Sequence, residues 1–512
     1  MAQESAQTVS GSTPDAALPG AGRVDRFALG GRTLRQHAAR GTMINAAFNV
    51  GLAALTVARR FLVAIFLTAT EYGIWGLIFV AVTAILWFKE IGINDKYIQQ
   101  DEPDQELAFQ KAFTLNLIWT GLFCLVILAA VPVFSVIYGQ PEIIAPGSLF
   151  SLAVLATAFQ APTWVFYRQM RYTAQRLLLS IEPVLGFIVT IVLGAAGAGY
   201  WSLVIGILAG TWAAALASVI WSPYPLRWRF DRAIVKDYYS FSWPLLLSAG
   251  SGFIVVQVSV IVGQATVGLV GVGAIGLAGT IAAFADRVDT IITQTLYPAV
   301  CAVKDRVDLL FEAFTKSNRL ALIWGMPFGL GLALFAPDVV HYVLGDKWDV
   351  ATGLLQVFGV MAGFKQIAFN WTAFHRAIGD TRPIAVNGVV SFVVFVALVI
   401  PGMILWGLTG YAIAICAMLA AQIVLRGYYL SRLFSGFRML RHTVRAVAPS
   451  VPAVAVIGGL HLLESGPRTG SLVVAELCLY LVVTVVATWL LERSLLREMF
   501  GYFRAATRPA GA

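Results

Sequence analysis

Three charged residues, Asp286, Arg287 and Asp289, lie within four positions of one another in the stretch AAFADRVDTI. Long apolar sequence flanks them on both sides, so the stretch reads as the middle of a membrane-spanning helix. One ionised side chain at the centre of an inserting helix costs about 2.5–3.5 kcal/mol on insertion scales. Because lipid cannot solvate three such charges, the stretch predicts either a polar cavity or an internal ion cluster.

Two interpretations of these charges remain open. At 100° per residue the three side chains occupy an arc of about 160°, so all of them can face the protein interior. In the first interpretation Arg287 pairs with both aspartates and braces the helix. In the second, Arg287 attracts an anionic substrate, while Asp286 and Asp289 line a cavity or take part in ion coupling. We favour the second, because an apolar helix packs at lower cost than an ion cluster that only satisfies itself.

A second pair of deep cations, Arg59 and Arg60, lies in the run NVGLAALTVARRFLVAIFL, with no acidic residue near it in the sequence. A planar guanidinium matches the oxygens of a phosphate or diphosphate, so the pair suits an anionic ligand. Alternatively, one arginine snorkels to the membrane surface or meets an acid within a span, such as Glu182. Only one of two adjacent side chains can point straight at a cavity.

Nine amide side chains also fall within apolar runs. They can hydrogen-bond a sugar, but polar side chains in membranes more often join one helix to another. They are Asn45, Asn49, Asn116, Gln257, Gln264, Gln294, Asn370, Asn387 and Gln422.

The composition is that of a membrane protein. Hydrophobic residues make up 59% of the 512 positions and charged residues only 12%, about half the charged fraction of an average soluble domain. The four cysteines show no spacing typical of a metal site or a disulfide framework. The GVGAIG run opens a membrane helix and follows no soluble strand, and the sequence has no Walker lysine motif. We therefore expect no cofactor, no metal and no catalytic residue.

The predicted fold class is all-α, a polytopic membrane protein with about fourteen transmembrane helices. Each apolar run is long enough to cross about 30 Å of hydrocarbon. The expected spans are 43–68, 72–93, 109–137, 147–167, 177–197, 200–221, 241–264, 272–302, 320–336, 350–374, 384–403, 408–430, 446–462 and 471–492.

The distribution of cations predicts the orientation. With both termini in the cytoplasm, the connections on that side carry 27 Lys and Arg, whereas the opposite connections carry only Lys347 and Arg468. This asymmetry follows the positive-inside rule. The net charge of +9 is thus loop charge beside anionic lipid, and no nucleic-acid partner is needed to explain it. Four further cations, which lie near expected cytoplasmic span ends and can snorkel, are Lys89, Lys111, Lys365 and Arg426.

Two parts of the chain echo each other. Trp119 and Pro132 find counterparts 205 residues later at Trp324 and Pro337. WVFYR likewise finds WTAFHR at an offset of 207. Each repeat holds six expected helices, an even number, so both lobes enter the membrane in the same orientation. Transporters built from such parallel repeats bind substrate between the halves.

The repeat defines a predicted domain organisation. Two six-helix lobes are joined by a basic cytoplasmic loop and followed by an additional helix pair, with a disordered cytoplasmic tail before and a basic cytoplasmic tail after them. The boundaries are 1–42 for the first tail, 43–221 and 241–430 for the lobes, 222–240 for the loop, 446–492 for the pair and 493–512 for the last tail.

Several short motifs resemble those of the Wzx-type oligosaccharide flippases in the multidrug/oligosaccharidyl-lipid/polysaccharide exporter superfamily. They are IFLTATEYGIWGLIFVAV, WFKEIGINDKYIQQ, LYPAVCAVKD, VLGDKWDVATGLLQVFGV and FHRAIGDTRP. The resemblance covers about residues 43–435 and implies two six-helix lobes around a central cavity. It also implies transfer of an undecaprenyl-diphosphate-linked oligosaccharide across the bacterial inner membrane by alternating access, for exopolysaccharide, capsule or O-antigen synthesis.

The same resemblance implies roles and partners. Arg59, Arg60 and Arg287 would meet the diphosphate or acidic sugars, membrane lipids would surround the chain, and a polysaccharide polymerase and glycosyltransferases would work beside it. Alternatives are a drug or metabolite exporter of the multidrug and toxin extrusion type, which usually prefers an acidic cavity, and a lipid II flippase of the same superfamily. A membrane glycosyltransferase, polymerase or ligase is disfavoured, because no DxD pair or large extracytoplasmic loop appears.

Overall fold

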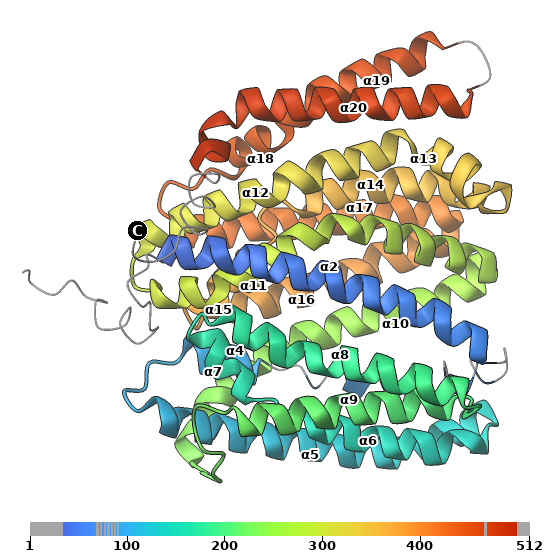
Figure 1. The fold of residues 1–512 in the computed structure, drawn as a ribbon. Helices are drawn as coiled ribbons and strands as arrows, with labels where there is room; N and C mark the ends of the chain where they lie inside the picture. Colours follow the sequence, from blue (N-terminus) through green and yellow to red (C-terminus); the bar gives the residue numbers. More distant parts are fainter. Residues whose placement is uncertain are drawn as a thin grey trace, which may run out of the picture.

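The computed structural model describes residues 34–67, 92–464 and 468–498, together with eight separate positions between 68 and 91. The expected span 72–93 therefore lies largely outside the described residues. Every regular element within the described part is a helix (Figure 1). This all-α architecture agrees with the predicted fold class.

The first group of helices, which we call the N-bundle, is built mainly from α2, α5, α6, α8 and α9, which pack on one another. Asp104 caps α5 by accepting a hydrogen bond from the Leu107 amide, and Gly139 ends the helix in the left-handed region at φ 63°. The helix α2 begins nine residues before the expected first span, within the segment predicted as a tail. The elements are α2 (Leu34–Phe66), α4 (Ile93–Gln99), α5 (Gln105–Tyr138), η1 (Pro141–Ile143), α6 (Ile144–Ala158), α7 (Pro162–Arg168), α8 (Tyr172–Ala195) and α9 (Trp201–Ile220).

The second group, the C-bundle, repeats this order of long helices and short connecting helices. Its first helix, α10, starts at Arg232 inside the predicted loop 222–240 and bends at Gly268, whose φ of 70° favours glycine. The elements are α10 (Arg232–Ala282), η2 (Ala283–Ala285), α11 (Asp286–Ala302), α12 (Val307–Leu334), α13 (Ala336–Asp338), η3 (Val339–Leu344), η4 (Asp346–Ala351), α14 (Thr352–Lys365), α15 (Trp371–Ala377), α16 (Arg382–Val394), η5 (Phe395–Val399) and α17 (Ile400–Leu433).

A helical hairpin follows the C-bundle and packs against α12 (Figure 1). Ion pairs fasten both ends of the hairpin. At one end Arg468 contacts Asp338 at 2.7 Å and also pairs with Glu476. At the other end Arg319 pairs with Glu492. The elements are α18 (Met439–Val447), η6 (Ala448–Ser450), α19 (Val451–Leu463) and α20 (Gly470–Leu491).

Within the described residues, nine helices are long and apolar enough to cross a membrane, and a bent pair adds a tenth crossing. That pair, Val307–Leu334 and Ala336–Leu344, bends by 65°. Four features separate this number from the fourteen spans that the sequence predicts. The expected spans 384–403 and 408–430 count as one stretch, although the backbone leaves the helical conformation at Gly407 between them. The helix α2, which covers the expected span 43–68, is not among the nine, 350–374 is broken between α14 and α15, and 72–93 is largely undescribed.

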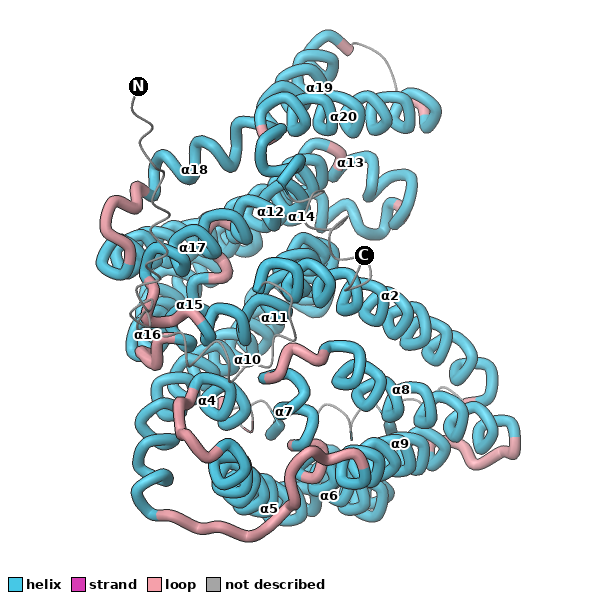
Figure 2. The backbone as a smooth tube through the Cα atoms, turned by 60° about the vertical axis from the view of Figure 1, so that its left-hand side comes forward, coloured by secondary structure: helices cyan, strands magenta, loops and turns pink. Residues whose placement is uncertain are grey.

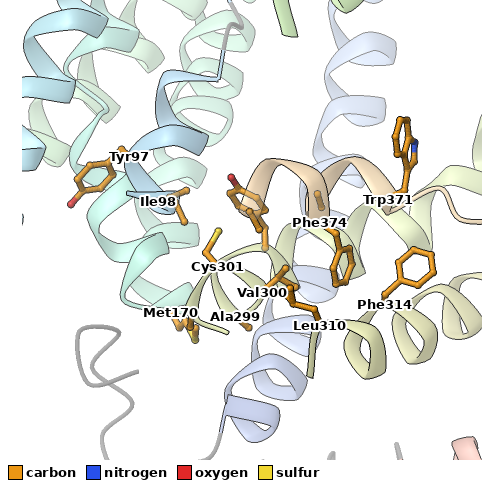
Figure 3. Close-up of a cluster of buried hydrophobic side chains, with 14 of the residues drawn as sticks. Tyr97, Ile98, Met170, Ala299, Val300, Cys301, Leu310, Phe314, Trp371 and Phe374 are labelled. Atoms are coloured by element: carbon orange, nitrogen blue, oxygen red, sulfur yellow. The ribbon is translucent and has the colours of Figure 1, made fainter. Parts of the chain in front are cut away.

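The two bundles share one apolar core at one end of the molecule. It combines Tyr97 and Ile98 of the N-bundle with Val300, Phe314 and Phe374 of the C-bundle. Figure 3 shows Val300 on α11 between Ile98 on α4 and Phe374 on α15. At the opposite end, the described apolar clusters draw on one bundle each. The bundles therefore share an apolar core at the end where α4, α7 and α15 lie, which faces the viewer in Figure 2, and have separate apolar clusters at the other end.

Candidate functional site

The charged stretch lies where one membrane-spanning helix tightens for a single turn. The helix α10 ends at Ala282, a 3-10 turn follows, and Asp286 and Asp289 occupy the first turn of α11. The backbone keeps right-handed helical angles through this turn, and the amides of Ala283 and Asp286 are hydrogen-bonded to carbonyls of the preceding turn. The stretch from Val270 to Ala302 therefore forms one span, in agreement with the sequence, which has no glycine or proline at the charged residues.

Asp286 finds its partners on α14 and directly after it. Its carboxylate contacts Lys365 Nζ at 2.8 Å and accepts a hydrogen bond of 2.6 Å from Gln366 Nε2. Among the described residues, Arg287 forms no ion pair with Asp286 or Asp289. The brace that the sequence allows is therefore made by Lys365, which pairs with Asp286 and does not merely snorkel at a span end.

Asp289 is the most buried charged group of this cluster. Its side chain is 1% exposed, and its Oδ1 has no hydrogen-bond partner in the described part of the chain. Arg426, which is also buried, acts electrostatically on both carboxylates and donates to the backbone carbonyls of Lys365 and Ile367. We call Asp286, Asp289, Lys365, Gln366 and Arg426 the C-bundle ion cluster. Within the C-bundle, the carboxylates of this cluster lie close to its cations.

Arg287 points away from this cluster. Its side chain is exposed, and its guanidinium lies 5.7 Å from the centre of the Phe284 ring. Seven residues further along α11, the exposed Gln294 points in nearly the same direction, since seven residues make almost two helical turns. Gln294 Oε1 accepts a 3.1 Å hydrogen bond from Arg176 of the N-bundle. The face of α11 that carries Arg287 therefore looks toward the N-bundle.

Arg59 and Arg60 lie at a different level. Asn45 of α2 bonds to Thr295 of α11 at 2.6 Å, which aligns the two antiparallel helices. From that contact, helical rise places Arg59 about 21 Å along α2 but Arg287 only about 12 Å along α11. Arg59 is half-buried, and the side chain of Arg60 lies outside the described part.

Charged side chains connect the bundles at their joined end. Asp95 of α4 pairs with Arg376 of α15 at 2.5 Å, and Asp101 pairs with Lys304 at 2.5 Å. The Tyr297 hydroxyl donates to the Asp95 carbonyl at 3.1 Å. We call these ion pairs, together with the Arg176 contacts described next, the inter-bundle lock.

Arg176 differs from the other cations of the inter-bundle lock because its described partners are uncharged amides. Its Nε donates to Asn45 Oδ1 at 2.5 Å within the N-bundle, while its Nη2 reaches Gln294 in the C-bundle. Nearby, the hydroxyl of Tyr172 donates to the Thr295 carbonyl at 2.7 Å. Two of the amides singled out in the sequence thus join helices here, as polar side chains in membranes commonly do.

Sequence reasoning missed several residues of this arrangement. Lys365 and Arg426 were expected to snorkel, and Arg176 was counted as a loop cation. One signal was present, because Asp95, Lys304 and Arg376 all lie within the short motifs that carry the family resemblance. Three segments far apart in the sequence thus meet in the inter-bundle lock.

Comparisons with known proteins identify the family. The model of a family described as "Polysaccharide biosynthesis protein" matches residues 62–352, which is more than half of the chain. Curated relatives include the teichuronic acid biosynthesis protein TuaB of Bacillus subtilis (strain 168), which is 21% identical over 302 residues. An uncharacterised membrane protein from the cps region of Klebsiella pneumoniae is 23% identical over 275 residues. The matches cover 55% and 53% of this chain, and 59% and 56% of the respective relatives.

Solved structures show the fold. A point mutant of MATE gives a TM-score of 0.66 at 16% identity, over 80% of this chain and 98% of that one. An outward-facing MATE family transporter of the MOP superfamily gives 0.64 at 14% identity, with the same coverage. MATE in its bent conformation gives 0.62 at 14% identity, over 83% of this chain and 96% of that one. The chain is thus a multi-pass membrane protein with the MATE fold, and it belongs to the family of polysaccharide biosynthesis proteins.

Proposed function

We propose that this protein is a flippase that moves a lipid-linked oligosaccharide from the cytoplasmic to the outer leaflet of the bacterial inner membrane. The carrier is undecaprenyl diphosphate, and the transported unit serves exopolysaccharide, capsule or O-antigen synthesis. Both termini lie in the cytoplasm, in line with the distribution of cations. A polysaccharide polymerase and glycosyltransferases are the proposed partners.

One observation carries this proposal. The bundles share a core and a lock at the end whose connecting loops carry most of the cations, while their described apolar clusters are separate at the other end. Such an arrangement supports alternating access, in which the two bundles rock about a site between them. We assign this structure to the outward-facing state, closed toward the cytoplasm.

The anionic end of the substrate is proposed to meet Arg287. This side chain is exposed on the inter-bundle face, about 10 Å from the lock by helical rise, and no described carboxylate neutralises it. A guanidinium binds phosphate oxygens in a planar, bidentate geometry. Arg59 and Arg60 remain proposed contacts higher in the same space, one of them facing it.

Ion coupling is proposed for Asp286 and Asp289. Asp289 is almost fully buried and has an unpartnered carboxylate oxygen, so adding a proton or sodium ion there changes the local charge balance strongly. Such a change alters how Asp286 divides its contacts between Lys365 and Gln366. Through the contacts of Asp286, the two carboxylates thereby link an ion gradient to the position of α11.

Replacement of Arg287 tests the proposal. Arg287→Ala should reduce transfer of lipid-linked oligosaccharide in proteoliposomes by about 10- to 100-fold, the value of hydrogen bonds to a charged group. Arg287→Lys keeps the charge but loses the fork, so it should retain intermediate activity. The double variant Arg59→Ala/Arg60→Ala should also lose export while remaining inserted.

The matched control is Arg306→Ala, because Arg306 is an exposed arginine outside the inter-bundle face that pairs with Asp308. It should transfer substrate at the wild-type rate. If the triple variant lacking Arg59, Arg60 and Arg287 exports as well as wild type, the role of the cations is wrong.

A second candidate function is export of a drug or metabolite. The solved structures with the same fold favour it in part, since their descriptions name MATE transporters. The two functions separate in one experiment. Purified protein in vesicles should transfer a diphosphate-linked oligosaccharide and ignore cationic dyes if it is a flippase, and should do the reverse if it exports drugs.

A further inference from the structure

A polar cavity of about 160 Å³ lies inside the N-bundle. On this measure of volume a single water needs about 10–15 Å³, so the cavity has room for about ten. We call it the N-bundle chamber. Its described lining residues, which come mainly from α4, α5, α6, α7 and α8, are Lys89, Gly92, Ile93, Asn94, Asn116, Thr157, Gln160, Thr163, Trp164 and Leu179.

The chamber is lined by polar groups that make no hydrogen bond to the described part of the chain. Asn116 is 8% exposed, and within the described part of the chain its amide makes no hydrogen bond. The amide of Asn94 and the indole N–H of Trp164 likewise have no described partner, and both residues are half-buried. By contrast, Thr157 and Thr163 satisfy their hydroxyls on carbonyls three residues earlier. The amides and the indole are therefore available to an occupant that both donates and accepts hydrogen bonds.

The chamber borders the inter-bundle face. Trp164 lies one turn before Tyr167 on α7, and Tyr167 donates to the Gln294 carbonyl of the C-bundle. Leu179 lies one turn after Arg176 on α8, and Arg176 contacts Gln294 as well. Residues one turn apart share a helix face. The chamber thus lies one helical turn away from the residues of α7 and α8 that contact the C-bundle.

We propose that the N-bundle chamber binds one pyranose unit of the transported glycan, an inference that rests on the proposed function. A pyranose presents hydroxyls to the amides of Asn94 and Asn116, and its C–H groups stack on the face of Trp164. Aromatic faces carry partial negative charge and attract such C–H groups. A phosphate is a poorer occupant, because Lys89 is the one cation in the described lining and cannot balance a doubly charged group alone.

Binding of free sugars tests the proposal directly. The probes are glucose, galactose and glucuronate, each titrated against the purified full-length chain by saturation-transfer NMR. At least one pyranose should bind the wild type. Asn116→Leu, which is similar in size but cannot hydrogen-bond, should weaken that binding by about fivefold or more, the loss of one hydrogen bond. Asn387→Leu, which replaces an amide of the C-bundle, is the matched control and should bind as wild type.

A second variant guards against misfolding of the first. Asn116→Asp is nearly isosteric and adds a negative charge, so it should disfavour glucuronate relative to glucose. If no pyranose binds the wild type better than glycerol does, or if both Asn116 variants bind sugars unchanged, the chamber holds only water and the inference is overturned.

Export measured in parallel separates this inference from the proposed function. Sugar binding that depends on Asn116, in a protein that transfers no lipid-linked oligosaccharide, supports the chamber and contradicts the flippase. Normal transfer by Asn116→Leu contradicts the sugar subsite and leaves the flippase standing.

Discussion

The two bundles have a glutamine at corresponding positions, but its surroundings differ between them. Each has a glutamine just before its short helix that donates to a carboxylate. Gln160 reaches Glu182 at 3.1 Å in the N-bundle, and Gln366 reaches Asp286 at 2.6 Å in the C-bundle. In the C-bundle, cations fill the surrounding space and form a closed ion cluster. In the N-bundle, the surrounding space is a chamber lined by amides that have no described hydrogen-bond partner. The same arrangement of helices thus holds the C-bundle ion cluster in one bundle and the N-bundle chamber in the other.

The largest effect is expected from breaking the C-bundle ion cluster at its buried cation. Arg426→Ala leaves two carboxylates and two backbone carbonyls without that cation. Removing one partner from a buried charge network costs about 3–5 kcal/mol. We therefore expect a strongly lowered thermal unfolding midpoint in detergent.

The control for that variant is Arg432→Ala, at an exposed arginine of the same helix. Its stability should stay within about 0.5 kcal/mol of wild type, as for ordinary surface substitutions. Equal midpoints for the two variants would show that Arg426 does not hold the cluster together.

A smaller effect should show which bundle carries the coupling acid. Asp289→Asn keeps the shape of the side chain but removes its titratable group. Gradient-driven transfer in proteoliposomes should then fall by about tenfold, within the usual range of coupling free energies. Transfer measured without a gradient should change little.

Glu182→Gln is the matched variant in the N-bundle, and it should leave gradient dependence intact. If Glu182→Gln abolishes the dependence while Asp289→Asn preserves it, the two bundles have the reverse roles, with coupling in the N-bundle.

The smallest effect concerns the joint between the bundles. Asp95→Asn removes the ion pair with Arg376 and should open the closed end more often. Cys301, which is 1% exposed in the shared core, reports this opening in a chain whose other cysteines are replaced. Its labelling by an impermeant maleimide should accelerate by about tenfold, which corresponds to a shift of 1.4 kcal/mol.

Two controls accompany the labelling experiment. Asp308→Asn removes a carboxylate whose described ion pair is with nearby Arg306, and it should not change the rate. The charge-reversed pair Asp95→Arg/Arg376→Asp should restore protection. Unchanged labelling of Asp95→Asn would mean that the apolar core alone keeps this end closed.

Sequence reasoning predicted the scaffold better than the site. Hydropathy indicates helices because each apolar run must satisfy its own backbone in lipid. It could not reveal that α14 stops at Lys365, since the run around it stays apolar through the turn that follows. The partner of Asp286 was therefore hidden in a segment that reads as continuous helix. Asn116 stood out as an amide, but the chamber around it is built from separate helices that only the fold brings together.

The short helix α4 gives the molecule a mechanical property of its own. Asn94 lines the N-bundle chamber, and its neighbour Asp95 holds the opposing bundle through Arg376. A seven-residue helix cannot tilt at one of these positions without moving the other. If the chamber binds a sugar, thermodynamic reciprocity requires that the bound sugar also shift the equilibrium between the open and closed states of the joined end. Forced opening of that end would change the affinity of the chamber for the sugar by the same factor. The helix α4 would then couple the proposed recognition of the glycan to the proposed movement of the bundles.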